Sequence, residues 1–345
     1  METKGRISSL DGARAVSIAL VIIGHANWNR TYPVIWRFHY WDLGVRIFFV
    51  ISGFLITKLL LEERARTGRI SIPQFYLRRA FRILPASYVY IAIVAALVPL
   101  GMHLAYKDIP SVLLYYANYH AHATRSPLGQ FWSLAVEEQF YFLWPAALVV
   151  LGTRRATAAC AALLVTAPVL RVLSDFGLWP GPPGGFLVVC DALATGCLLA
   201  LLREQLWSAR PYRTIVESWA LWALAACAIL LTCKGVPAPL IGAIGVPLLN
   251  VSIAMLLDRY MRMPGTPIGR ALNWRPITWL GGISYSLYIW QQPWMFSTLP
   301  QIVRFAGAFS CAALSFYLVE KPMLRLRARI SKGSGRSARL AEATP

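Results

Sequence analysis

The chain has 345 residues, of which 57% are hydrophobic and only 14% are charged, and its formal net charge is +19. A soluble domain carries roughly 25% charged residues, so this composition argues against a soluble protein. The apolar residues occur in blocks of about 17–22, the length that a helix needs to cross a ~30 Å hydrocarbon layer. A membrane barrel would show period-two alternation, which the sequence lacks.

The positive charge does not indicate nucleic-acid binding. Arg and Lys concentrate in alternate connections between the apolar blocks and in the tail from Lys321 to Arg339. This alternation is the orientation signal of an inner-membrane protein, and it predicts that both termini face the cytoplasm. The six cysteines lie in or at the ends of apolar blocks, without the spacing of a metal site. We therefore expect no nucleic-acid partner and no metal.

About ten helical spans are predicted, which makes the fold class an all-α polytopic membrane bundle. In chain order the spans cover residues 10–27, 41–61, 84–104, 131–151, 156–174, 186–202, 216–233, 239–257, 277–293 and 301–319. We expect one transmembrane domain over residues 1–330. The basic remainder, 331–345, is predicted to be a disordered cytoplasmic tail.

Ionisable groups inside a span cost about 2.5–3.5 kcal/mol each at mid-membrane, which makes them functional candidates. Arg14 and His25 are eleven residues apart in the first span. They therefore share one helix face and lie about 16 Å apart along the axis. Glu137 and Glu138 are adjacent in the fourth span, so at most one of them can face His25. The alternative roles are a satisfied core histidine and a helix–helix hydrogen bond.

Three arginines, Arg78, Arg79 and Arg82, precede the third span, and helical spacing brings them to one side of a turn. Guanidinium groups bind phosphate well. Ordinary cytoplasmic charge explains the spacing alone at least as well. Arg46 in the second span and Asp191 in the sixth are a candidate ion pair.

These groups suggest two levels of chemistry. Arg14, Arg79 and Arg82 on the cytoplasmic side suit a phosphorylated donor, while His25 and Glu137 suit proton transfer. A nucleotide bound by the arginines at the cytoplasmic side would connect the two groups of residues if it carried a flexible arm long enough to place a thioester beside His25. Coenzyme A has this form.

Six motifs, in this order, resemble those of the acyltransferase 3 family of membrane-bound acyltransferases, and they cover about Ile7 to Arg327. They are Arg14-x10-His25; GVRIFFVISGFLI at 44–56; Arg79-x-x-Arg82 before Leu84-Pro85; Trp132-Ser-Leu-x-Val-Glu137-Glu-Gln-Phe-Tyr141; Ser284-Tyr-Ser-Leu-Tyr-Ile-Trp290; and Glu320-Lys-Pro322.

The resemblance implies a multi-pass enzyme of a bacterial cytoplasmic membrane that moves an acyl group, commonly acetyl, from acyl-coenzyme A to a hydroxyl of a saccharide or glycolipid. It implies catalysis by His25 with Glu137 as acidic helper. The family's donor-binding arginines match Arg14, Arg79 and Arg82. Motif residues with supporting roles are Ser133, Glu138, Tyr141, Tyr285, Tyr288 and Glu320.

Two departures from the family pattern bear on the mechanism. Many members have His where this chain has Gln291, which removes any role of a second histidine. Some members also carry an extracytoplasmic esterase-like domain, whereas this chain ends soon after Lys321. We therefore expect a one-domain mechanism.

We expect direct transfer, in which neutral His25 takes the proton of the acceptor hydroxyl while Glu137 orients or stabilises the ring. A covalent acyl-histidine is the alternative route. A transporter or flippase of an amphiphilic, lipid-linked substrate is the alternative function. It would favour broken helices and pseudo-symmetric halves, and the sequence shows no internal repeat. A membrane scaffold would leave the aligned Arg14 and His25 unexplained. The sequence makes no prediction of oligomeric state.

Overall fold

The computed structural model describes residues 7–26, 40–97, 108–120 and 127–330. Within these ranges the regular elements are all helical, and no strand occurs. The all-α prediction is therefore confirmed for the described part of the chain. The predicted tail, 331–345, lies outside it.

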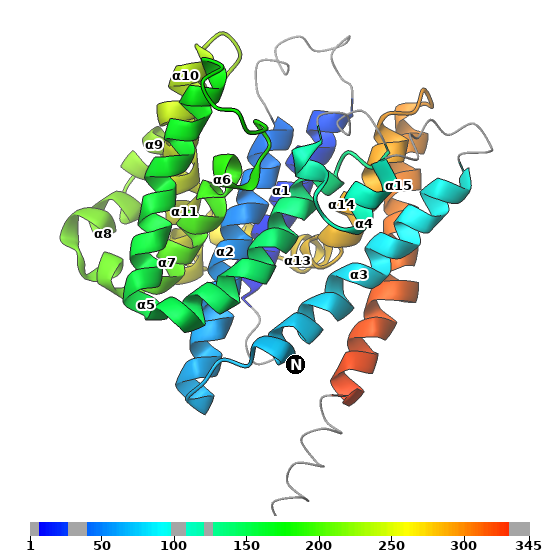
Figure 1. Cartoon of the computed structure of the whole chain (residues 1–345), viewed down its shortest axis with the longest axis horizontal. Helices are drawn as coiled ribbons and strands as arrows, with labels where there is room; N and C mark the ends of the chain where they lie inside the picture. The colour runs from blue at the N-terminus through cyan, green and yellow to red at the C-terminus, as the bar shows by residue number, and fades with distance from the viewer. Residues whose placement is uncertain (1–6, 27–39, 98–107, 121–126, 331–345) are drawn as a thin grey trace, which may run out of the picture.

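The first half of the chain forms long helices joined by short ones (Figure 1). Its elements are α1 (Ser8–His25), α2 (Tyr40–Thr67), α3 (Ile72–Leu97), α4 (Ile109–Leu113), the 3-10 turn η5 (Ala117–Tyr119) and α5 (Phe131–Asp175). The second half is more broken. Its elements are α6 (Phe186–Val189), α7 (Asp191–Ser208), α8 (Arg210–Glu217), α9 (Ala220–Leu231), α10 (Ala238–Leu240), the π-helix η7 (Ile241–Gly245), α11 (Val246–Arg262), α12 (Pro267–Leu272), α13 (Arg275–Gly282), α14 (Ser284–Met295), α15 (Gln301–Ser315) and the π-helix η8 (Phe316–Glu320).

Five helices of the described ranges are long and apolar enough to cross a membrane, and the pair α8 and α9, bent by 80°, could provide a sixth span. The five are Asp42–Thr67, Ile72–Leu97, Phe131–Asp175, Ala238–Arg262 and Gln301–Ile330. The chain is therefore a helical, multi-pass membrane protein.

Helices cover most of each predicted range. The ranges 131–151 and 156–174 both lie in α5, and the non-helical backbone of Gly152, where φ is +68°, divides this element into two helices at a kink, as the two predicted ranges require. The largest difference concerns the third range. The third range was predicted to begin at residue 84, whereas α3 begins at Ile72. Pro73 suits the first turn of a helix, because its missing N–H would have no partner there. The early start places the arginines that precede the span on the same helix.

The centre of the bundle is formed by α1 and α2, with α5 on one side and α3 and α15 on the other (Figure 1). The helix α1 packs against α2, α13 and α14, while α2 packs closely against α7. Gly53 and Gly196 make the second contact tight. A Cβ on Gly53 would lie 2.0 Å from the Leu193 carbonyl oxygen, and one on Gly196 would lie 2.1 Å from that of Val50. Small residues allow membrane helices this approach.

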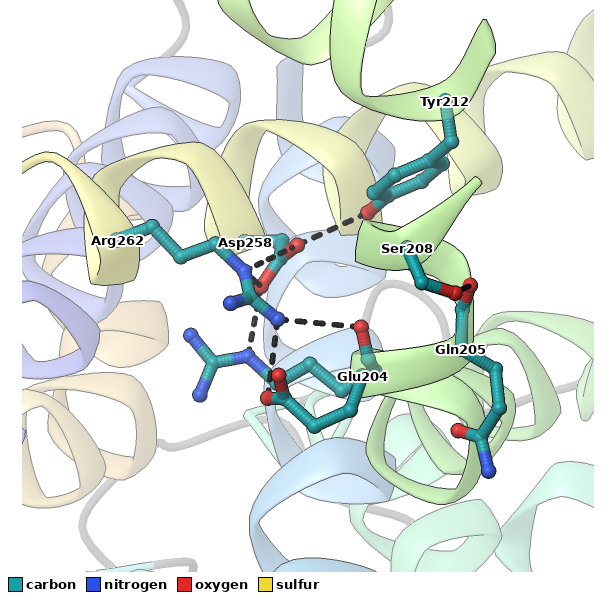
Figure 2. A network of polar contacts seen from close by, with 7 residues as sticks. Glu204, Gln205, Ser208, Tyr212, Asp258 and Arg262 are labelled. Carbon is teal, nitrogen blue, oxygen red and sulfur yellow. Dashed lines mark hydrogen bonds and ion pairs between the residues drawn. The ribbon is translucent and has the colours of Figure 1, made fainter. Parts of the chain in front are cut away.

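A buried ion network joins α7, α8 and α11 (Figure 2). Asp258 is 0% exposed and accepts hydrogen bonds from Arg203 at 2.7 Å, Arg262 at 3.1 Å and Tyr212 at 3.1 Å. Arg262 also bonds the exposed Glu204 at 3.1 Å. Because Asp258 has several donors around it, the network can hold the three helices together without an uncompensated charge.

Candidate active site

A cavity between α1, α2, α3, α5 and α14 gathers most of the predicted site residues. Eight of them line it: Arg14, Arg79, Arg82, Ser133, Glu137, Tyr141, Tyr285 and Tyr288. His25, Glu138 and Glu320 are not among the described residues that form its walls. The cavity therefore unites the predicted donor-binding arginines with one of the two predicted catalytic groups.

The arginines of α3 are divided between two environments. Arg79 points into the cavity, where its Cζ lies 5.2 Å from the centroid of the Tyr141 ring. Arg82, one turn further along α3, also lines the cavity. Arg78 instead forms an ion pair with Glu63 at 2.7 Å. Of the three arginines of this helix, Arg79 and Arg82 therefore line the cavity, while Glu63 of α2 holds Arg78 outside it.

Arg14 supplies the third guanidinium of the cavity. It lies two turns into α1 and bonds Asp11 at 3.0 Å. The positive charges of Arg79 and Arg82 act on one another, and that of Arg14 acts on both. Three cations around one space, with the carboxylates of Glu137 and Asp11 beside them, suit a ligand that carries phosphates.

Glu137 lies in this cavity with a partner that the sequence analysis did not single out. The Ser52 hydroxyl of α2 donates to the Glu137 carboxylate at 2.5 Å and lies 3.0 Å from the Tyr141 hydroxyl. This contact joins α2 to α5, as the helix–helix alternative for Glu137 supposed. The helper role toward His25 stays a prediction. A hydroxyl inside the apolar run FFVISGFLI was the signal that could have identified Ser52.

Ser133, Phe48 and Tyr288 form one end of the cavity lining. The hydroxyl groups of Ser133 and Tyr288 are hydrogen-bonded to each other. The Phe48 and Tyr288 rings meet edge to face with centroids 5.9 Å apart. Because Ser133 is two turns before Tyr141 on α5, this end lies opposite Arg79, which contacts Tyr141.

His25 lies at the end of α1 and is not among the residues that line the cavity. Its ring meets Phe296 edge to face with centroids 5.7 Å apart, and the Gln291 side chain is within hydrogen-bonding reach. Gln291 follows Tyr288 by three residues, or about 4.5 Å of helical rise. His25 therefore lies about one helical turn from the Tyr288 side of the cavity. Along the axis of α1, Arg14 and His25 are about 16 Å apart.

Arg304, which the sequence analysis did not name, joins the two helix ends around His25. It is 8% exposed and donates to the carbonyl oxygens of Ala26 at 3.2 Å and Met295 at 2.9 Å. Those carbonyls belong to the residue after His25 and the residue before Phe296. A cation at the carboxyl ends of two helices is favoured by both helix dipoles. The position of Arg304 as a charged residue in an apolar span was the signal that could have identified it.

The other two predicted acidic residues, Glu320 and Glu138, do not line the cavity. Glu320 is 3% exposed and accepts a hydrogen bond from Ser286. Glu138 is next to Glu137, and its buried Oε1 has no hydrogen-bond partner among the described residues. Within the same residues, no group of three or more His, Cys, Asp or Glu could hold a metal ion.

Arg46 and Asp191, the candidate ion pair, each have a nearer partner of opposite charge. Arg46 pairs with Asp42 at 2.7 Å, one turn earlier on α2. Asp191 pairs with Arg171 of α5, also at 2.7 Å. The negative charge of Asp191 still acts on Arg46, but the two side chains form no direct ion pair.

Comparison with known proteins identifies the family. Residues 7–319 match the family described as an acyltransferase domain, the acyltransferase 3 family. The Bacillus subtilis (strain 168) protein YrhL, whose name gives peptidoglycan O-acetyltransferase as a provisional activity, is 31% identical over 357 residues, 92% of this chain and 55% of its own length. Peptidoglycan O-acetyltransferase OatA of Listeria monocytogenes serovar 1/2a is 29% identical over 370 residues, 92% of this chain and 56% of its own length.

The chain thus spans about half the length of these curated relatives. No solved structure is similar to it. The family match covers the five helices that build the cavity and also includes His25. The chain therefore belongs to the acyltransferase 3 family and is a transferase enzyme.

Proposed function

We propose that this protein transfers an acetyl group from cytoplasmic acetyl-coenzyme A to a hydroxyl group of a saccharide in the bacterial cell envelope. Two relatives whose names give peptidoglycan O-acetyltransferase support the acetyl group and the saccharide acceptor. The observation that carries the donor is the cavity in which Arg14, Arg79 and Arg82 converge. Acyl transfer needs an activated donor, and coenzyme A thioesters combine that activation with phosphates.

In this proposal the phosphates of coenzyme A bind at the arginine end of the cavity. Arg79 and Arg82 enter from α3, and Arg14 enters from α1, so two helices fix the directions of the guanidinium groups. Charge-assisted hydrogen bonds of this kind contribute roughly 1.5–3 kcal/mol each. The pantetheine arm then extends along the cavity toward Tyr288. The thioester reaches His25 one turn further on.

The chemical step uses neutral His25 as general base. The acceptor hydroxyl oxygen attacks the thioester carbonyl carbon while His25 takes the hydroxyl proton, a role worth about 10²–10⁴-fold. When the carbon–sulfur bond breaks, His25 returns that proton to the leaving thiolate. Glu137 would stabilise the intervening imidazolium by its charge across the weakly polar interior.

The topology of the proposal follows the charge pattern. We place the chain in the bacterial cytoplasmic membrane with ten spans, one domain over residues 1–330 and both termini in the cytoplasm. Arg14, Arg79 and Arg82 then lie on the side where acetyl-coenzyme A is made. His25 lies nearer the outer side, where the envelope saccharides are found.

The proposal is tested with purified protein in detergent, acetyl-coenzyme A labelled in the acetyl group, and soluble peptidoglycan fragments as acceptor. The expected product is labelled saccharide that loses its label in mild alkali, as an O-acetyl ester does. Tight binding of a lipid-linked saccharide, with neither thiol release nor labelled ester, would instead favour the transporter. Thiol release with no labelled saccharide would mean that the acceptor belongs to another class.

A further inference from the structure

Gln291 has a buried side-chain amide. It lies on α14 and is 0% exposed. Within the described residues, its amide nitrogen and oxygen make no hydrogen bond of regular geometry, although the His25 ring is within reach of the amide. A buried donor or acceptor without a partner costs about 1–3 kcal/mol. A fold rarely keeps such a group unless the group meets a ligand or a water molecule.

The adjacent residue, Gln292, shows how a structural glutamine behaves at the same depth. It is 3% exposed, and its side-chain oxygen accepts the backbone N–H of Gln130 at 3.1 Å. Gln130 precedes the first residue of α5, so this bond satisfies a donor that the helix leaves open. Gln292 therefore joins α14 to α5. Gln291 makes no such bond, although it belongs to the same turn.

The location of Gln291 indicates the ligand. Its amide is within reach of the His25 ring, and it lies about one turn along α14 from Tyr288, which lines the cavity. In the proposed function, the thioester carbonyl occupies this place during transfer. The group that needs a donor there is the carbonyl oxygen, which gains negative charge when the acceptor attacks.

We infer that the amide N–H of Gln291 donates a hydrogen bond to this oxygen and stabilises the tetrahedral intermediate. This inference rests on the proposed function. As the carbon–oxygen bond forms, the carbonyl π pair moves onto the oxygen, and His25 holds the acceptor proton. When the pair returns, the carbon–sulfur bond breaks, and coenzyme A leaves with that proton. A preorganised donor of this kind is worth about 10²–10³-fold in kcat.

The test compares Gln291→Met with Gln292→Met, because methionine has nearly the same length and no amide. For each variant we would measure kcat, the KM for acetyl-coenzyme A and the thermal unfolding midpoint in detergent. Gln291→Met should lose about 100–1000-fold in kcat with little change in KM. Its unfolding midpoint should be unchanged or higher, since an unpaired buried amide is removed.

Gln292→Met should behave in the opposite way. Its unfolding midpoint should fall, because the Gln130 N–H loses its acceptor, while kcat stays within about threefold of the wild type. A Gln291→Met protein that unfolds early but keeps its kcat would contradict the inference and make Gln291 structural. If Gln291→Met does not fold, Gln291→Asn replaces it. Asn retracts the amide by one methylene and should still lower kcat by about tenfold or more.

The same data separate this inference from the proposed function. An active wild type and an inactive His25→Ala, together with an unaffected Gln291→Met, would refute the role of Gln291 alone. A folded wild type that neither binds nor turns over acetyl-coenzyme A would refute the proposed function and, with it, this role.

Discussion

The guanidinium group of Arg79 lies over the ring of Tyr141, with Cζ 5.2 Å from the ring centroid. Its neighbour in the chain, Arg78, pairs with Glu63 at 2.7 Å and does not line the cavity. A single turn of α3 thus supplies one arginine to the cavity and another to the packing of α2. The two residues form a matched pair for experiments.

Replacing Arg79 by Ala should weaken binding of acetyl-coenzyme A by about 10- to 150-fold, the loss that corresponds to one charge-assisted contact of roughly 1.5–3 kcal/mol. Replacing Arg78 by Ala removes the same charge outside the cavity and should change the dissociation constant by less than about threefold. Isothermal titration calorimetry in detergent measures both. Equal losses for the two variants would mean that overall charge, and not the cavity, attracts the donor.

Arg304 should affect catalysis without touching either substrate. Lysine keeps the positive charge, but it lacks the two guanidinium nitrogens with which Arg304 donates to the Met295 and Ala26 carbonyl oxygens at the same time. We expect Arg304→Lys to lower kcat by about 10- to 100-fold, because small displacements of catalytic groups have effects of that size. The KM for acetyl-coenzyme A should stay near that of the wild type.

Gln301→Ala is the control for Arg304, since Gln301 is exposed at the start of the same helix. It should leave kcat unchanged. A wild-type kcat in a folded Arg304→Lys protein would show that the clamp between α1 and α14 does not position His25.

The network around Asp258 makes a prediction about stability (Figure 2). Asp258→Ala leaves Arg203 and Arg262 partly buried without their shared carboxylate, which should lower the free energy of unfolding by about 3–5 kcal/mol. Glu204→Ala removes a partner whose side chain is 76% exposed, and this loss should be below about 1 kcal/mol. Unfolding in detergent, followed by circular dichroism, measures both values. If Asp258→Ala and Glu204→Ala lowered the free energy of unfolding by similar amounts, the buried carboxylate of Asp258 would not be what stabilises this region.

Much of the fold could be predicted because lipid imposes simple rules. Apolar blocks of sufficient length become helices, since nothing in the hydrocarbon layer can bond their backbone groups. The boundaries were harder. The early start of α3 at Ile72 depends on local turn chemistry in a polar connection. Hydropathy alone does not report that chemistry.

The site was predictable where a charged residue stood alone in an apolar span. Arg14 was identified in this way. Arg79 was identified as one of three arginines before a span and Glu137 as one of two adjacent carboxylates, and the structure brings all three residues to one cavity. Spacing along one helix could not identify partners on other helices. The pairing of Asp191 with Arg171 and the bond from Ser52 to Glu137 depend on tertiary packing.

The central claim is that His25 catalyses acyl transfer from acetyl-coenzyme A. The most direct test follows release of free coenzyme A from acetyl-coenzyme A by purified wild type and His25→Ala, with saccharide acceptor present. The account predicts turnover by the wild type and a loss of at least about 100-fold in the variant, with donor binding retained. A His25→Ala protein that turns over at the wild-type rate would contradict it.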